Sequence, residues 1–264
     1  MSAKKKRLNI KDGVRLLTGS TKKPFVIAKI SPGFNNTEKK ALKGLKLTLS
    51  EVTGNYGYCG AYNSGLKDRV SKYIQSLGNT KKDSDITADL IVNKIIGPFM
   101  RSLPRQQYLW LAIRPSKPNS HFKVPRWHTD GQFFHHEKFR KDPKFYQMKL
   151  AATLKGPSTI LKAPSKSERT AFRKFAAESS TAYLAKDMAS VMRIREEVAI
   201  RWKDIKIETP KYGEVAIFVT GNRDRAGFHS EPHTTSDRLF LSVLPGDKDG
   251  MAAFAKKKGE KFYD

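Results

Sequence analysis

The sequence predicts an α+β protein, in which strands of the second half form a sandwich or barrel and helices flank it. From Gln107 onward, short segments rich in β-branched and aromatic residues recur between turn residues, a pattern typical of sandwiches and barrels. Segments on either side of Gln107 carry apolar residues at helical spacing instead. The chain has 264 residues, which is long enough to bury a substantial core.

The first part of the chain predicts a basic arm followed by a mixed strand and helix region. Residues 1–23 carry many lysines and arginines and few acidic residues, so we expect a basic arm. It is either a phosphate-binding tail or a flexible, solvated terminus. Residues 24–104 are expected to form a buttress that packs on the core. Within it, alternation and helical spacing predict strands at 24–30 and 45–52, a glycine-rich loop at 54–65, and helices at 66–77 and 84–103.

Residues 105–246 are expected to form the core domain. A capping box of Ser165 and Glu168 marks the start of a helical insert at 165–198, because this pair satisfies two amide groups of a first helical turn. Residues 247–264 are expected to form a C-terminal tail. The strands expected before the insert are 108–115, 144–156 and 158–164, and those after it are 205–209, 213–219, 226–232 and 238–244.

The charge of the chain indicates an anionic partner. Lysine and arginine exceed aspartate and glutamate by 51 to 25, a formal net charge of +26. A polyanion neutralises such self-repulsion, which favours nucleic acid as the partner, although a lysine-rich solubilising surface is the alternative. Between Lys123 and Lys149, cations alternate with aromatic residues. This segment either contacts phosphates and stacks on bases or is a solvated loop.

The single cysteine and the absence of long apolar runs indicate the cellular compartment in which the protein is expected. Cys59 has no intrachain cysteine partner, so a reducing compartment is expected. No stretch approaches the ~20 apolar residues of a membrane helix. We therefore expect an intracellular, non-secreted protein of the cytoplasm, the nucleus or the inside of a virus particle, and the sequence predicts no oligomeric state.

Three residues form a candidate metal site. His128 and Asp130 are two apart, so on an extended segment both side chains leave the same face; a loop histidine hydrogen-bonded to a turn aspartate is the alternative. His229 can supply a third ligand, although His233 is a second candidate for that position. Two imidazoles and one carboxylate form the facial ligand set that leaves three coordination positions open on Fe(II).

A candidate anion site lies next to this metal site in the sequence. If the segment that carries His229 pairs with the strand that begins at Arg238, the guanidinium can reach the same cavity and bind a carboxylate. Arg114 is a second candidate for co-substrate binding, or else part of a surface ion pair. Trp127 either lines the pocket or lies in the core. His135 and His136 are expected in an exposed loop.

The order of these motifs resembles a known superfamily. His-x-Asp in PRWHTDG, then GPST, GEVAIF, FHSEP and RLFLSV resemble the Fe(II)- and 2-oxoglutarate-dependent oxygenases, most of all their phytanoyl-CoA hydroxylase-like branch, over residues 105–246. The resemblance implies a double-stranded β-helix, a jelly-roll or cupin-like core. It also implies Fe(II) bound by His128, Asp130 and His229, with the far carboxylate of 2-oxoglutarate on Arg238.

Three hypotheses for the function follow. The first is a non-haem Fe(II)- and 2-oxoglutarate-dependent dioxygenase, a hydroxylase or demethylase, that acts on or near nucleic acid. The second is a basic nucleic-acid-binding or virion packaging protein that keeps the β-helix scaffold with little or no catalysis. The third is a cupin-type metal protein that does not use 2-oxoglutarate.

Overall fold

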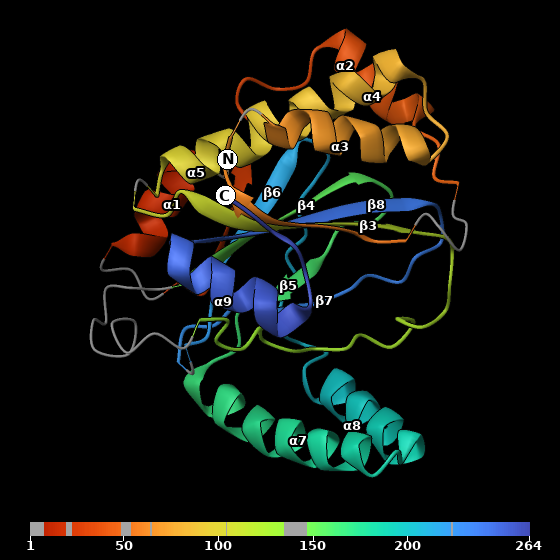
Figure 1. Ribbon diagram of the computed structural model, residues 1–264. Coiled ribbons are helices and arrows are strands. Elements are labelled where there is room, and N and C mark those ends of the chain that lie inside the picture. Colours follow the sequence, from red (N-terminus) through yellow and green to blue (C-terminus); the bar gives the residue numbers. More distant parts are fainter. Residues whose placement is uncertain are drawn as a thin grey trace, which may run out of the picture.

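The computed structural model describes residues 8–19, 23–48, 54–63, 65–103, 105–134, 147–222 and 224–264. In Figure 1 the elements form layers. Helices lie above a large sheet, a small sheet lies beneath it, and a helical hairpin projects below the small sheet. Within the described residues, no helix is both long and apolar enough to cross a membrane.

The large sheet contains seven strands. Adjacent strands are antiparallel, except for one parallel pair at the edge of the sheet. That pair is β2–β9. The small sheet contains β5 (Ile160–Lys162) and β7 (Phe228–Ser230), which pair antiparallel. The order of the large sheet is β1 (Phe25–Lys29), β6 (Glu214–Thr220), β4 (Gln147–Lys155), β8 (Arg238–Gly246), β3 (Tyr108–Ser116), β2 (Tyr56–Ala61) and β9 (Phe262–Tyr263).

The chain passes alternately between the two sheets. From β4 it enters β5 in the small sheet, returns to β6, enters β7, and returns to β8. Between β3 and β4, His128 forms a bridge to His229, so this connection also runs along the small sheet. Successive strands that alternate between two facing sheets are the winding of a double-stranded β-helix. The α+β class and the β-helix core that the sequence predicts are therefore confirmed.

Helices cover the outer face of the large sheet, as expected from their apolar spacing. They share one buried apolar cluster with the strands, which includes Val70, Ile74, Ile95, Leu241 and Val243. The helices are α1 (Ile10–Thr18), α2 (Asn36–Gly44), α3 (Gly65–Ser76), α4 (Lys81–Asp89), η1 (Leu90–Ile96), a π-helix, and α5 (Gly97–Arg101). The three segments α4, η1 and α5 follow one another without a break. They begin at Lys81, earlier than the predicted start at Ser84, because the side chain of Thr80 caps the helix by accepting from the Asp83 amide.

Residues along each strand alternate between this outer core and the inner face. On β8, Leu239, Leu241 and Val243 lie in the core that the helices cover. Because side chains of a strand alternate between the faces of its sheet, Arg238 and Ser242 lie on the opposite face. That inner face looks toward the small sheet, so polar residues of the large sheet are directed to the space between the sheets.

Four predictions of local structure were wrong. Residues 10–18, inside the predicted basic arm, form α1, because Ile10, Val14 and Leu17 share one buried helical face. Residues 45–48 form no strand, although Leu45 and Leu47 are buried. Residues 56–61 form β2 rather than a loop. Residues 205–209 supply one isolated bridge, from Glu208 to Leu161. The remaining predicted strand residues 49–52 and 144–146 lie outside the described residues.

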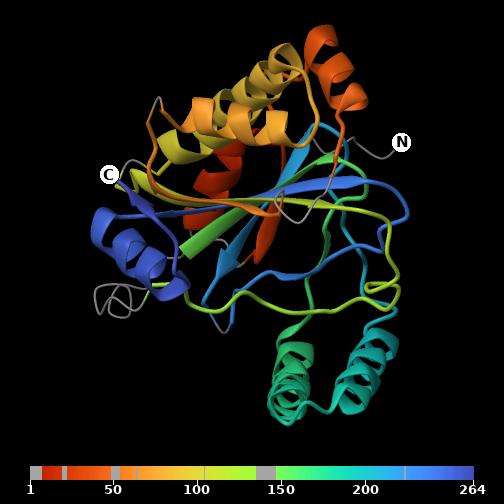
Figure 2. The ribbon, with the colours of Figure 1, turned by 45° about the vertical axis from the view of Figure 1, so that its right-hand side comes forward.

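The insert forms a helical hairpin of α7 (Lys166–Leu184) and α8 (Met188–Arg201), which projects away from the sheets (Figure 2). Its capping box at Ser165 and Glu168 is confirmed. The base of the hairpin packs on a cluster that contains Trp127, Val198, Trp202 and Phe228. This cluster therefore joins the hairpin to the residues that precede His128 and His229.

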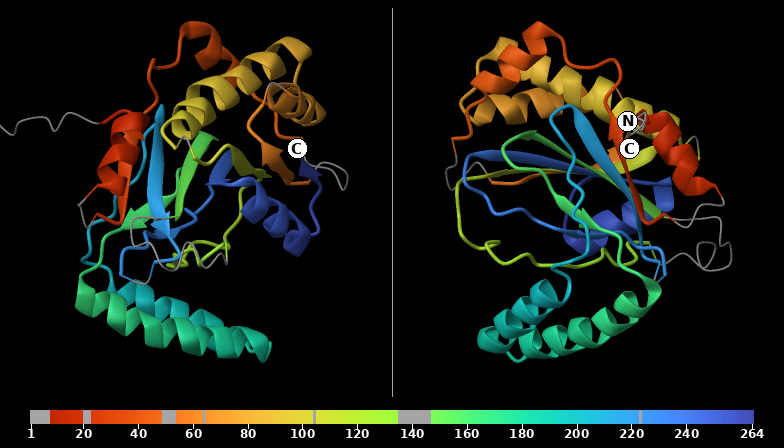
Figure 3. Two further views of the ribbon diagram at one scale, coloured as in Figure 1. Left: turned by 60° about the vertical axis from the view of Figure 1, so that its left-hand side comes forward. Right: turned by 180° about the vertical axis from the view of Figure 1, so that it is seen from behind.

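The C-terminal residues also fold against the core. They form α9 (Lys248–Lys258) and then β9, which adds a parallel strand beside β2. Figure 3 shows α9 beside the sheet on the side opposite to α3 and α4. A cluster of Cys59, Trp110, Met251 and Phe254 fills the space between α9 and the sheet. Helix α9 therefore covers this part of the inner face.

Candidate metal centre

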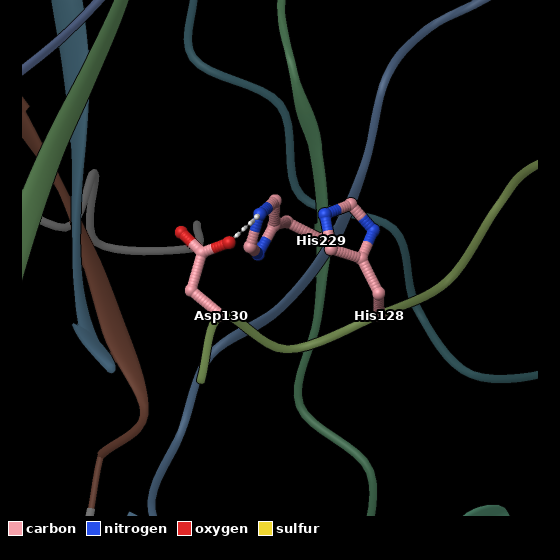
Figure 4. Close-up of side chains that lie close together, drawn as sticks. All are labelled: His128, Asp130 and His229. Atoms are coloured by element: carbon pink, nitrogen blue, oxygen red, sulfur yellow. Dashed lines mark ion pairs between the residues drawn. The ribbon is translucent and has the colours of Figure 1, made fainter. Parts of the chain in front are cut away.

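The three predicted metal ligands lie together between the two sheets. One ligand atom from each of His128, Asp130 and His229 lies within 4.8 Å of the other two, and Figure 4 shows the side chains converging. The backbone explains this: the amide of each histidine donates to the carbonyl of the other, both at 3.0 Å. Asp130 follows two residues later, and the amide of Gly221 donates to its carbonyl at 3.0 Å.

Both imidazoles present the same nitrogen to the centre. Nδ1 of His128 lies 2.8 Å from the carbonyl oxygen of Arg126, and Nδ1 of His229 lies 3.1 Å from that of Gly227. A carbonyl oxygen only accepts, so each Nδ1 carries a proton, and in the neutral form of such an imidazole Nε2 keeps its lone pair. Such a contact behind a histidine orients it as a metal ligand.

The environment sets the charge of each ligand. Burial, reinforced by the neighbouring His128, lowers the pKa of His229 to about 4, so this imidazole is neutral at pH 7. Burial by itself would raise the pKa of Asp130, but the ammonium of Lys149 and the adjacent histidines hold that pKa below its usual value. The site therefore offers a neutral imidazole and a carboxylate anion in contact.

The contact between Asp130 and His229 identifies a place for a cation. Oδ1 of Asp130 lies 3.7 Å from Nε2 of His229, the pair joined by the dashed line in Figure 4. Neither atom carries a hydrogen to donate, because the carboxylate is ionised and the imidazole is protonated at Nδ1. A metal ion between them would satisfy both lone pairs. Two imidazoles and one carboxylate are ligands that suit non-haem Fe(II).

Lys149 holds the other oxygen of Asp130, and the sequence analysis did not identify it. Its Nζ lies 2.8 Å from Oδ2 of Asp130. The available signal was a lysine inside the apolar strand β4, where alternation directs residue 149 to the inner face. The same face of β4 carries Gln147, whose Oε1 accepts from the amide of Phe133 at 3.0 Å.

Arg238 is a buried cation near the start of the small sheet. The residue as a whole is 7% exposed. Its Nε donates to the carbonyl of Pro157 at 2.9 Å, and an Nη donates to Oγ1 of Thr159 at 3.4 Å. Burial lowers its pKa to about 10, so it stays charged at pH 7, and Glu231 is the nearby acidic group that opposes this shift. Among the described residues, no carboxylate forms an ion pair with it within 4.0 Å.

The route by which Arg238 reaches this position differs from the predicted one. β8 does not pair with β7, because β7 pairs with β5 and β8 lies between β4 and β3. Arg238 instead crosses from the large sheet to Thr159, directly before β5. Arg238 therefore lies beside the start of β5, the strand whose Leu161 lies opposite His229.

The remaining candidates have different positions. Arg114 is exposed and lies opposite Phe240 of β8, and its charge contributes to the lowered pKa of Arg238. His233 is exposed and is not part of the ligand group. Trp127 is buried against Trp202, with ring centroids 6.1 Å apart. His135 and His136 lie outside the described residues.

Glu231 is a second residue that the sequence analysis did not single out. Its Oε1 accepts from Arg126 at 2.7 Å. Burial would raise the pKa of Glu231, but the neighbouring His128 and Arg126 bring it below its usual value. Glu231 lies two residues after His229, so alternation along the strand directs it to the same side. Glu231 therefore adds an anion that interacts electrostatically with both His128 and Arg238.

Comparison with known proteins found similarity in structure only. No protein-family model matches the chain, and no curated protein matches it. A Kdo hydroxylase, KdoO, described as a non-haem Fe(II) α-ketoglutarate-dependent dioxygenase, is 11% identical with a TM-score of 0.46, over 96% of this chain and 91% of that chain. An N-substituted L-amino acid dioxygenase from Burkholderia ambifaria is 13% identical with a TM-score of 0.43, over 91% and 89%.

A third similar structure is an oxidoreductase of the 2OG-Fe(II) oxygenase family from Burkholderia pseudomallei. It is 11% identical with a TM-score of 0.38, over 92% of this chain and 94% of that chain. Identities are low and the TM-scores are below 0.5 in all three cases. The chemistry of the site therefore has to be inferred from its own side chains.

Proposed function

We propose that this protein is a non-haem oxygenase that binds Fe(II) through His128, Asp130 and His229 and uses 2-oxoglutarate as co-substrate. One observation carries the proposal: Oδ1 of Asp130 and Nε2 of His229 face each other at 3.7 Å. With the carboxylate ionised and His229 protonated at Nδ1 alone, neither atom has a hydrogen to donate. The Nδ1 contacts of both histidines support it, because they direct both Nε2 lone pairs to the centre.

Arg238 supports the assignment of a dicarboxylate co-substrate. A buried charge without a counter-ion is costly, and a bound carboxylate would remove that cost. Nε of Arg238 already donates to Pro157 and one Nη to Thr159, so the guanidinium is fixed in orientation while other N–H groups remain for a ligand. The Thr159 hydroxyl accepts from Arg238 and can donate its own proton to the same carboxylate.

The chain's residues would hold and orient the reactants rather than react themselves. Three protein ligands leave three positions on an octahedral ion, enough for a chelating 2-oxo acid and dioxygen. Bound iron with these reactants would supply the oxidising power for hydroxylation or demethylation at a C–H bond. The protein's part is to place the substrate carbon beside the open positions and to exclude water from the space between the sheets.

We further propose that the substrate is nucleic acid or a molecule bound to it. The net charge of +26 supports this, because it exceeds what a small-molecule substrate would require. The projecting hairpin adds exposed cations near its packed base and along its helices. They include Lys166, Lys174, Lys186, Arg201 and Lys203. Residues 135–146 of the predicted stacking segment, which runs from Lys123 to Lys149, lie outside the described residues.

The first test is anaerobic titration of the protein with Fe(II) and 2-oxoglutarate. We expect a weak visible charge-transfer band in the wild type and no band in His128→Ala. His233→Ala is the matched control, because this exposed histidine lies outside the ligand group. A wild type without the band, or a band that survives His128→Ala, would contradict the proposed iron site.

The second test separates catalysis from packaging. Succinate formation is measured with and without single-stranded or duplex nucleic acid, and affinity is measured against salt concentration. An oxygenase acting on nucleic acid should form more succinate when it is added. A packaging protein would show a steep salt dependence, which reports counterion release, but neither the charge-transfer band nor succinate.

A further inference from the structure

The two oxygens of Asp130 have different partners, and this difference has a chemical use. Oδ2 lies 2.8 Å from Nζ of Lys149, whereas Oδ1 faces Nε2 of His229 at 3.7 Å. We propose that Lys149 is a positioning residue that restricts Asp130 to coordinating the metal through Oδ1 alone. The inference rests on the proposed metal site and concerns how many positions that site leaves open.

The lysine is held firmly enough to act in this way. The side chains of Lys149 and Asp130 are 12% and 15% exposed, so water competes poorly for their contact. The ammonium also lies 5.7 Å from the ring of Trp110 and 5.4 Å from that of Phe133, distances at which a cation is attracted to an aromatic face. One carboxylate oxygen and two rings therefore surround it.

The same strand fixes the backbone on which Asp130 lies. Gln147, two residues before Lys149 on β4, accepts from the amide of Phe133. The carbonyl of Asp130 accepts from the amide of Gly221, at the end of β6. Before Asp130, the backbone of His128 is paired with that of His229. The backbone is thus attached on both sides of Asp130, and Lys149 determines the remaining freedom, which is rotation of the carboxylate.

Coordination through one oxygen matters for the proposed chemistry. A carboxylate can bind a metal through one or both oxygens, and binding through both would occupy a fourth position. Only two positions would then remain, whereas a chelating 2-oxo acid and dioxygen together need three. A charge-assisted hydrogen bond engages Oδ2 and makes it a poorer metal ligand. Lys149 therefore keeps the third position open.

The experiment counts water molecules on a bound metal ion. Mn(II) is titrated into the apoprotein, and the relaxation rate of water protons is measured at saturation, because it reports exchangeable water on the ion. We expect about three open positions in the wild type. In Lys149→Met, which removes the ammonium but keeps an unbranched chain, we expect the enhancement to fall by about a third as Oδ2 displaces one water.

The controls separate positioning from general effects on folding. Lys155→Met changes a lysine of the same strand, whose amine donates to the carbonyl of Leu45 and not to the metal site; its enhancement should equal that of the wild type. Lys149→Arg keeps a charged donor and should restore most of the lost enhancement. Lys149→Gln, a neutral donor, allows the same measurement if Lys149→Met does not fold.

The outcomes are distinct. Saturated Lys149→Met with the wild-type enhancement would overturn the role of Lys149 while leaving the metal site intact. A wild type that binds no Mn(II) would overturn the proposed metal site and the role of Lys149 with it. A fall in enhancement in Lys149→Met that Lys149→Arg reverses would support both.

Discussion

The two faces of the large sheet use the same strands for different purposes. Its outer face is apolar: Leu109 and Ile113 of β3 and Leu241 and Val243 of β8 are fully buried against helices. Its inner face carries Lys149, Arg238 and other polar groups, directed to the small sheet. The comparison teaches that a strand's alternation can separate stability from chemistry, with neighbouring residues assigned to different tasks.

The separation also explains why charged groups are tolerated inside the molecule. Buried charges are costly unless they are paired or hydrogen-bonded. On the inner face Lys149 pairs with Asp130, and Arg238 donates to Pro157 and Thr159. The apolar burial in the large cluster on the outer face can offset the remaining free-energy cost of burying these charges. Substitutions on the two faces should therefore change different measured quantities.

The largest effect is expected from removing a metal ligand. His229→Ala should lower oxygenase activity by roughly 1,000-fold, or about 4 kcal/mol, since it removes an ion that stabilises charge in the transition state. Succinate formation under saturating Fe(II) measures the loss, and thermal unfolding should show a folded protein. Activity within 10-fold of the wild type would place the chemistry elsewhere.

A substitution on the outer face should change stability but not metal binding. Leu241 is fully buried in the outer core, so Leu241→Ala should lower the free energy of unfolding by about 3 kcal/mol. Urea denaturation measures this change, and Mn(II) affinity of the folded protein should be that of the wild type. A large change in Mn(II) affinity would show that the two faces are coupled.

A smaller effect is expected at Arg238. Arg238→Met should weaken 2-oxoglutarate binding by about 2 kcal/mol, since a charge-assisted hydrogen bond is lost. Calorimetric titration of the metal-loaded protein measures the affinity, and Mn(II) binding itself should not change. If 2-oxoglutarate binds this variant as tightly as the wild type, Arg238 is not the residue that anchors its carboxylate.

The smallest effect is expected under α9, where the inner face is closed. Cys59 is fully buried, and Cys59→Ala should cost about 1 kcal/mol of unfolding free energy, since it removes little more than one methylene's volume. Burial, with a contribution from Glu260, raises the pKa of the Cys59 thiol to about 12. Iodoacetamide at pH 8 should therefore alkylate it only after unfolding. Rapid alkylation of the folded protein would mean that α9 opens.

Much of the core could be predicted because its signals are local. The capping box of Ser165 and Glu168 predicted the start of α7, and the apolar runs predicted β3, β6 and β8. Among the metal ligands, the histidine-aspartate spacing predicted that His128 and Asp130 converge, and the resemblance favoured His229 over His233 as the third side chain of the group. Their binding of iron remains a prediction.

Other features depend on contacts between distant residues. The glycines of residues 54–65 predicted a loop, but a side chain at Gly60 would lie 2.1 Å from the carbonyl of Tyr263, so glycine is needed there for β9 to approach β2. Helix α1 was not predicted, because the many lysines of residues 1–23 obscured the apolar spacing of its buried face. Lys149 was missed because its partner, Asp130, belongs to another segment, and no local pattern joins them.

The cluster at the base of the hairpin contains Trp127 and Phe228, and each directly precedes one of the two histidines. A shortened or exchanged insert should therefore keep Val198 and Trp202, because both side chains belong to the cluster that contains Trp127 and Phe228. The tip of the hairpin, where α7 ends, should tolerate substitutions and insertions better, because Leu184 is 82% exposed. A graft placed there, such as a fluorophore or an affinity tag, would report on encounters with other molecules without disturbing the residues that lie between the two sheets.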